Sequence, residues 1–265
     1  MFNRIRKSIS HPKYAFLFLK DKFTRIFLYI LILATVMSLP IFFVSAVNPT
    51  MLFPSRQEIG LQINPMLNNN IRIENDKLID ENNNNHFITI GSYNVLMNLE
   101  TYPNAGIYLV FEEEHLVTKI SGGSSYVLES NRISYKELGY NNLEFDISNK
   151  NFVINLILDG FTSDKLVITS IAISSLLINY FDLLILILLL AFISSLFKVL
   201  PLKFSDHFKI NTYIVTIYAF VMLILNLFGL LYLDFIAIVI AYIYQNIAYR
   251  SIRIIRKVEV KKKDE

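Results

Sequence analysis

Hydrophobic residues are gathered into three long blocks along the chain, and polar residues fill the segments between them. The first block covers residues 26–47 without a charged side chain, the second covers 166–197, and the third covers 213–248. About 20 apolar residues in a helix span a hydrocarbon core about 30 Å thick. The first two blocks each predict one transmembrane helix. The third block is too long for one span and is interrupted around Gly229, so it predicts a hairpin of two further helices.

The first block also has features of a secretory signal peptide, because Val44 and Ala46 resemble the small residues of a cleavage site. However, the apolar block and the leader before it, residues 1–25, are both longer than those of a signal peptide. We therefore favour an uncleaved transmembrane helix over residues 26–47.

Residues 48–165 contain runs of alternating apolar and polar side chains that are rich in β-branched and aromatic residues. This pattern is typical of strands in a sheet with one buried face and one solvated face. Turn signals such as Gly122-Gly123 separate the runs. We expect an antiparallel, mostly β domain of about 100 residues, which is large enough to bury its own core. The predicted strands lie within residues 88–99, 107–111, 115–120, 143–147 and 152–158.

The end of this domain leads directly into the second apolar block. Ser163 can cap a helix that begins with Asp164 and continues through residues 166–199 as the second span. The third and fourth spans are expected within residues 211–249. The predicted fold class is therefore α+β, with four transmembrane helices and a mostly antiparallel β domain between the first and the second.

Basic residues predict the orientation, because Lys and Arg collect on the cytoplasmic flanks of membrane spans. Residues 1–25 carry seven Lys or Arg against one acid, Asp21, and residues 200–210 and 250–265 are also basic. Residues 48–165 instead carry 8 Lys or Arg against 15 Asp or Glu. Four crossings place the three basic segments in the cytoplasm. We therefore predict a multi-pass plasma-membrane protein with both termini cytoplasmic and residues 48–165 extracytoplasmic.

The leader, residues 1–25, has a helical pattern of its own. Phe2, Ile5 and Ile9 recur at helical spacing among basic residues, which predicts an amphipathic helix on the inner leaflet. A leader that only fixes the orientation of the first span accounts for the same residues.

Composition narrows the classes of function. A hydrophobic content of 54% and a mean hydropathy of +0.45 are typical of a membrane protein. The formal net charge of +3 is too small to suggest nucleic-acid binding. Because the chain has no cysteine, disulfides, thiolate metal sites and cysteine nucleophiles are excluded.

Motifs for catalysis or cofactor binding are absent from the sequence. The four histidines are too far apart to predict a metal cluster, and Gly122-Gly123-Ser124-Ser125 lacks the lysine of a phosphate-binding loop. No G-x-S-x-G nucleophile motif occurs. We predict that the protein is not an enzyme and that it binds no metal or cofactor.

Polar residues inside the apolar blocks are the remaining candidates for a site. Asp182 and Asp234 each lie 16 residues, and Asn226 lies 17 residues, from the nearest basic flank. These separations correspond to about 24 to 26 Å along a helix. Asn179 lies about one turn from Asp182. The four residues therefore predict a polar layer at one depth in the outer leaflet.

This layer has two interpretations. An intramembrane carboxylate usually faces the bundle, water or a partner, which favours a pocket for a ligand, an ion or a partner helix. Alternatively, Asp234 caps the fourth helix, Asn226 ends the third, and Asp182 meets water where the outer domain thins the membrane.

Several segments resemble a known family. They are SISHPKYAFLFLKDKFTRIFLYILILATVMSLP (8–40), IRIENDKLIDE (71–81), GIYLVFEEEHLVTK (106–119) and FKINTYIVTIYAFVMLILNLF (208–228). Together they are similar to the uncharacterised bacterial "maltodextrin utilization protein" family of low-GC Gram-positive membrane proteins, within the wider Yip-type membrane superfamily. The resemblance implies a plasma-membrane protein, sometimes encoded beside sugar transport genes, with no established activity and no catalytic residues.

These observations predict an accessory or interaction protein of the membrane, connected with sugar uptake or the cell envelope. Its expected partners are the lipid bilayer and either another protein or further copies of the chain, and not nucleic acid. The alternative is a ligand sensor or small transporter that uses the outer-leaflet polar residues. Four spans with a single proline, Pro40, offer few of the broken helices on which transporters rely.

Overall fold

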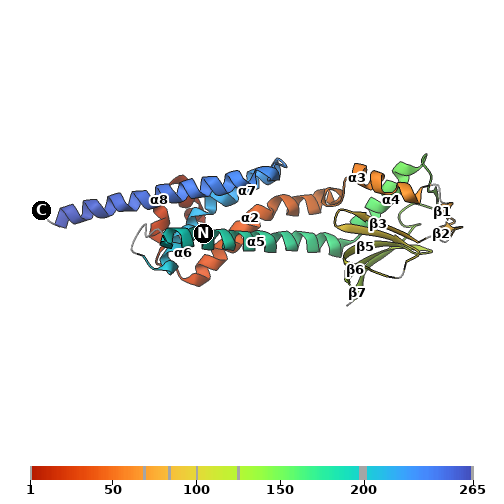
Figure 1. Cartoon of the computed structure of the whole chain (residues 1–265), viewed down its shortest axis with the longest axis horizontal. Helices are drawn as coiled ribbons and strands as arrows, with labels where there is room; N and C mark the ends of the chain where they lie inside the picture. Colours follow the sequence, from red (N-terminus) through yellow and green to blue (C-terminus); the bar gives the residue numbers. More distant parts are fainter. Residues whose placement is uncertain are drawn as a thin grey trace. The chain divides into compact units, whose positions relative to one another are not determined.

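A computed structural model describes residues 2–67, 70–82, 85–99, 101–123, 126–196 and 202–263, with the side chains of helix α8 described as far as Ser251. The chain divides into two compact units. The helical unit comprises Met1–Phe42 and Ala172–Glu265, and the α+β unit comprises Phe43–Ile171 (Figure 1).

The helical unit is built from the long helices α2, α5 and α8 and several shorter helical elements. Its elements are α1 (Phe2–Ser10), η1 (Pro12–Phe18), α2 (Phe23–Val47), α5 (Lys165–Leu196), α6 (Phe204–Ile214), α7 (Thr216–Leu227), η4 (Leu231–Leu233) and α8 (Asp234–Lys263). Helix α2 ends within the residues of the α+β unit, and helix α5 begins there. Helices α7 and α8 lie side by side as a hairpin (Figure 1). Gly229, with φ +67°, lies in their connection, where a residue without Cβ is favoured.

Within the described residues, three helices are long and apolar enough to cross a membrane: Phe23–Val47, Lys165–Leu196 and Phe204–Leu227. The prediction of four such helices is therefore wrong. The fourth predicted span is the return arm of the hairpin, helix α8, and its apolar run is interrupted by Gln245 and Asn246. The third span also begins earlier than predicted, because α6 makes residues 204–210 helical rather than a loop.

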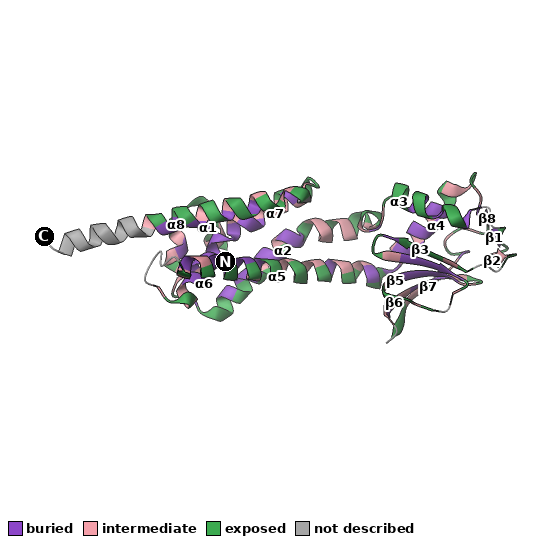
Figure 2. Ribbon diagram, in the orientation of Figure 1, coloured by how far each residue is buried: buried purple, intermediate pink, exposed green. Residues whose placement is uncertain are grey.

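The core of the helical unit joins α2, α5, α6, α7 and α8. Buried and exposed residues recur along α2 and α8 (Figure 2). Tyr29, Leu33 and Met37 of α2 are fully buried, as are the alanines Ala237 and Ala241 of α8. Small residues spaced four apart let a helix approach its neighbours closely. The opposite faces of α2, α5 and α8 expose large apolar side chains, which is the pattern expected of helices in contact with lipid.

The α+β unit contains two sheets that are mostly antiparallel, as predicted. The larger sheet has the order β3-β4-β5-β6-β7, in which only the β4–β5 pair is parallel, and the smaller sheet has the order β2-β1-β8. The strands are β1 (Ile71–Glu74), β2 (Lys77–Asp80), β3 (His86–Ile90), β4 (Tyr93–Met97), β5 (Ala105–Phe111), β6 (His115–Gly122), β7 (Val127–Ser134) and β8 (Asn142–Glu144). The helical elements are η2 (Pro49–Leu52), α3 (Arg56–Gln62), η3 (Asn64–Met66) and α4 (Lys150–Ser163).

Helix α4 corrects one of the strand predictions. Residues 152–158, predicted as a strand, form the middle of α4, whose buried side chains include Val153, Ile157 and Phe161. A short apolar run fits either a buried strand or a buried helix, so its sequence did not discriminate between them. Helix α4 packs closely on the larger sheet at Gly160, where an added Cβ would lie 2.4 Å from Leu116 Cδ2.

The strand predicted over residues 88–99 is a hairpin of two strands. Strands β3 and β4 are joined at Gly91, which has φ +62°. Tight hairpin turns require positive φ values, for which glycine is the favoured residue. Gly91 was the sequence signal for this turn. The residues on both sides of it are apolar enough that the whole segment was predicted as one strand.

The cap of helix α5 is Asp164 rather than the predicted Ser163. The Asp164 carboxylate accepts hydrogen bonds from the backbone N–H groups of Leu166 (2.8 Å) and Val167 (3.0 Å). The Ser163 hydroxyl instead donates to the carbonyl of Gly160 at 2.7 Å. Helix α5 therefore begins at Lys165, separate from α4.

Candidate functional site

The four predicted intramembrane residues lie in different surroundings. Asn179 is half-buried, and its amide donates to the Ser38 hydroxyl of α2 at 2.8 Å. Asp182 and Asp234 are both exposed on the surface of the helical unit. Asn226 is half-buried at the end of α7, where its carbonyl accepts from the backbone N–H of Gly229 at 3.2 Å.

The structure brings Asp182 and Asp234 close to one shared group. The hydroxyl of the buried Tyr218, on α7, lies within electrostatic range of both carboxylates. The carboxylates come from α5 and from the first turn of α8. Both carboxylates therefore interact electrostatically with Tyr218, whereas Asn179 is hydrogen-bonded to Ser38 of α2.

We expect Asp182→Leu to insert normally but to lose most of the protein's function or assembly. The reason is that a carboxylate in lipid costs about 2.5 to 3.5 kcal/mol, so its retention implies a contact that leucine cannot make. The measurement is rescue of a deletion strain, with membrane fractionation to check insertion. Ile185→Leu, on the same exposed face, is the control and should behave as wild type. Full rescue by Asp182→Leu would rule out a role for the polar layer.

A second set of polar side chains is fully buried between α5, α6 and α8. Gln245 Nε2 lies within hydrogen-bond distance of the Leu190 carbonyl (2.8 Å), the Ser194 hydroxyl (2.6 Å) and Asn211 Oδ1 (2.9 Å), so its two N–H groups are shared among three acceptors. Buried amides are stable only when hydrogen-bonded, so this network fixes the three helices in register. Gln245, a polar residue within the apolar part of α8, therefore faces the protein interior.

The lone acid of the leader, Asp21, is the centre of a third cluster. Its buried carboxylate accepts from Arg4 (2.9 and 3.0 Å), from Arg25 (2.9 Å) and from the Tyr213 hydroxyl. Burial acts to raise the pKa of Asp21, but the hydrogen bonds from Arg4, Tyr213 and Arg25 outweigh it and lower the pKa to about 2. The leader is therefore part of the folded helical unit, tied to α2 and α6.

The α+β unit carries an open pocket of about 700 Å³, a volume in the range of small-molecule sites. Its walls come from the end of β2, the segment after β4, the end of β5 and the middle of β6. The polar lining side chains are Asp80, Asn98, Tyr102, Glu112, Glu113 and Lys119, and the apolar ones are Leu78, Leu99, Val110 and Phe111.

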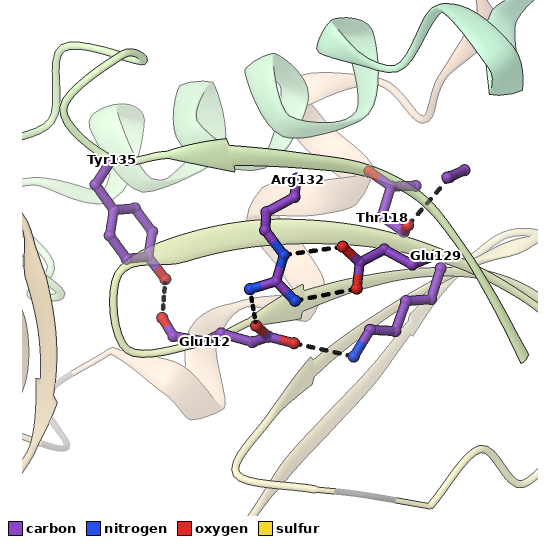
Figure 3. A network of polar contacts seen from close by, with 7 residues as sticks. Glu112, Thr118, Glu129, Arg132 and Tyr135 are labelled. Atoms are coloured by element: carbon purple, nitrogen blue, oxygen red, sulfur yellow. Dashed lines mark hydrogen bonds and ion pairs between the residues drawn. The ribbon is translucent and has the colours of Figure 1, made fainter.

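Ion pairs fix the charged wall of this pocket (Figure 3). The Glu112 carboxylate is held at 2.9 Å by Lys119 on one oxygen and at 2.9 Å by Arg132 on the other. The Tyr135 hydroxyl donates to the Glu112 carbonyl at 2.8 Å. Burial acts to lower the pKa of Lys119, but its interactions with Glu112 and Tyr102 together outweigh burial, so the pKa is raised and Lys119 stays charged at neutral pH.

A β-bulge between Thr118 and Lys119 determines which residues of β7 join this wall. It brings Arg132 and Glu129 together, with their side chains paired at 2.8 Å (Figure 3). The Ser130 hydroxyl instead donates to Asp164, the cap of α5. One edge strand thus contacts both the pocket wall and the first turn of α5.

The lining of the pocket offers groups that can bind a ligand. Its side chains supply oxygen acceptors, one ammonium and two aromatic rings. In the described residues, no group of three or more His, Cys, Asp or Glu side chains is placed to hold a metal ion. Sequence reasoning missed this site because its residues come from four separate segments, and the only local signal was the Glu112-Glu113-Glu114 run.

The chain was compared with protein-family models, curated proteins and solved structures. None of the three comparisons gave a match.

Proposed function

We propose that the protein is a non-catalytic accessory protein of the plasma membrane that presents residues 48–165 outside the cell as a binding domain. The observation that carries this proposal is the pocket beside Glu112, with its fixed charged wall, in a chain that also has three long apolar helices. The helices anchor the protein, and the pocket receives a ligand or a segment of a partner.

The proposed orientation has the leader and the C-terminal segment in the cytoplasm, which requires α8 to return across the membrane beside α7 although it is less apolar than the three long helices. The basic leader favours the cytoplasmic side. Helix α8 returns along α7, and the Tyr244 hydroxyl donates to the Ile9 carbonyl of the leader. Tyr249, also on α8, is 2.8 Å from the ring nitrogen of His207 at the start of α6. These contacts support a common side for both termini.

The resemblance to the maltodextrin utilization proteins adds a setting to this proposal, namely sugar uptake or the cell envelope. A second candidate function is ligand sensing through the intramembrane carboxylates. The observation in its favour is the placement of Asp182 and Asp234 about the buried Tyr218.

The orientation can be tested by cysteine labelling, because the chain has no cysteine and single substitutions give a clean background. We expect Lys136→Cys, exposed on the α+β unit, to react with a membrane-impermeant maleimide on intact cells. Lys7→Cys, exposed on α1, should react only after permeabilisation. The opposite labelling pattern would overturn the proposed orientation. Photo-cross-linking from Lys136 in intact cells would then test for a partner.

A further inference from the structure

The carboxylates of the pocket already have protein partners. Glu112 is bound by Lys119 and Arg132, and Glu113 is paired with Lys77 at 3.0 Å. Asp80 accepts from the Asn98 amide at 2.6 Å. A site for a metal ion or a polyamine would instead direct its carboxylate charge toward the ligand. These contacts therefore weaken the case for a cationic ligand.

The same oxygens still have lone pairs that can accept further hydrogen bonds, because each carboxylate oxygen can accept more than one. They are held in place by their ion pairs, so a ligand that donates hydrogen bonds does not have to order them first. An acceptor-rich wall of this kind is complementary to hydroxyl groups. Lys119, which remains charged, supplies donors to a hydroxyl or ring oxygen.

The pocket also has apolar lining residues. Leu78, Leu99 and Val110 line it together with the half-buried ring of Tyr102. The Tyr102 ring is held edge-on by Tyr108, with centroids 5.2 Å apart, and by Lys119, 5.9 Å from its centroid. A ligand that matches both the polar and the apolar lining residues has hydroxyl groups at its edges and C–H groups on its face.

We infer that this pocket binds an uncharged, hydroxyl-rich ligand, a saccharide or polyol, through Asp80, Asn98, Glu112 and Tyr102. This inference deepens the proposed function, on which it rests for access to the pocket from outside the cell. A free oligosaccharide and a glycan chain of the envelope share the required chemistry.

The test is saturation-transfer NMR and calorimetric titration of the purified full chain in nanodiscs. Glucoside and maltoside detergents must be removed, because their headgroups belong to the proposed ligand class. The probes are glycerol, maltotriose, cellotriose, chitotriose and fragments of envelope glycan, with spermidine and Ca²⁺ as cationic probes. Binding of a short saccharide would indicate a free sugar. Binding of glycan fragments alone would indicate the envelope polymer.

Matched substitutions locate the site. We expect Asp80→Asn, which removes a charged acceptor, and Tyr102→Ala, which removes the aromatic ring, each to weaken binding of the responding probe by about tenfold or more. Tyr126→Ala, which changes an exposed tyrosine outside the pocket, should leave affinity unchanged. Because Asp80→Asn keeps the size and shape of the side chain, a loss of binding in this variant would not be explained by misfolding.

Three results would overturn the inference: binding of spermidine or Ca²⁺ but of no saccharide, no binding of any probe, or saccharide binding that Asp80→Asn and Tyr102→Ala leave unchanged. Such results would not affect the proposed membrane orientation, which cysteine labelling tests separately. Inverted labelling with saccharide binding intact would overturn the orientation and leave the pocket chemistry standing.

Discussion

Replacing Asp21 with alanine is expected to destabilise the helical unit by about 3 kcal/mol or more. Breaking a buried ion pair by removing one partner typically costs this much, because the remaining charge has no compensation. Here, the change would leave Arg4 and the buried Tyr213 hydroxyl without their shared acceptor. The measurement is unfolding of the purified full chain by heat or by SDS in mixed micelles.

The stability contributed by Asp21 should also depend on pH in a defined direction. Its pKa is about 2 in the folded protein, below the ordinary 3.8. A depressed carboxyl pKa adds stability above the unfolded pKa, and that stability is lost as pH falls through the folded value. We therefore expect wild-type stability to fall by about 2 kcal/mol between about pH 4 and pH 2. In Asp21→Asn this contribution should be missing.

Asp206 provides the matched control, since it is an acid in the first turn of α6 in the same unit. Acids at helix N-termini typically contribute about 0.3 to 1 kcal/mol, so Asp206→Ala should have a much smaller effect. Equal losses for the two alanine variants would show that the Asp21 cluster has no special role in holding the leader.

The sequence identified the long helices but not how their polar residues are used. Helices α2 and α5 follow from apolar runs longer than a membrane span, a signal that does not depend on tertiary contacts. Helix α8 was overestimated as a span because Gln245, Asn246 and Arg250 make it less apolar than the other long helices. Their equal separations from the basic flanks predicted Asp182 and Asp234 at one depth in the membrane, and in the structure both interact with Tyr218. A separation counted in residues along a helix gives a depth but not the direction in which a side chain points.

The α+β unit was harder to predict because its structure depends on contacts between distant residues. The α4 run fits a strand or a helix equally well until it is packed against Leu109 and Leu116. The pocket needs the end of β2 beside the end of β5, and the sequence contains no signal for that juxtaposition. Asp21 did have a signal, since it is the only acid in a basic leader. A lone acid among cations is a reasonable candidate for a buried ion pair.

The second large effect is expected for Asp164→Ala, at the junction between α4 and α5. The Asp164 side chain is buried and accepts from two backbone N–H groups and from the Ser130 hydroxyl. Loss of an N-cap costs about 0.5 to 2 kcal/mol, and a buried donor left without an acceptor costs about 1 to 3 kcal/mol. We expect the first turn of α5 and strand β7 to lose about 2 to 4 kcal/mol of local stability.

Hydrogen exchange of the full chain in nanodiscs measures this loss directly, at the amides of Leu166 and Val167 and along β7. Ser163→Ala is the informative control, because Ser163 is the cap that the sequence predicted, and its hydroxyl accepts from Asn131 at 2.9 Å. It should leave the Leu166 and Val167 amides protected, and Asp164→Asn should fall between the two. If Ser163→Ala exposed those amides and Asp164→Ala did not, the cap would be the serine after all. The α5 helix would then start one residue earlier, without the bond that joins its first turn to β7.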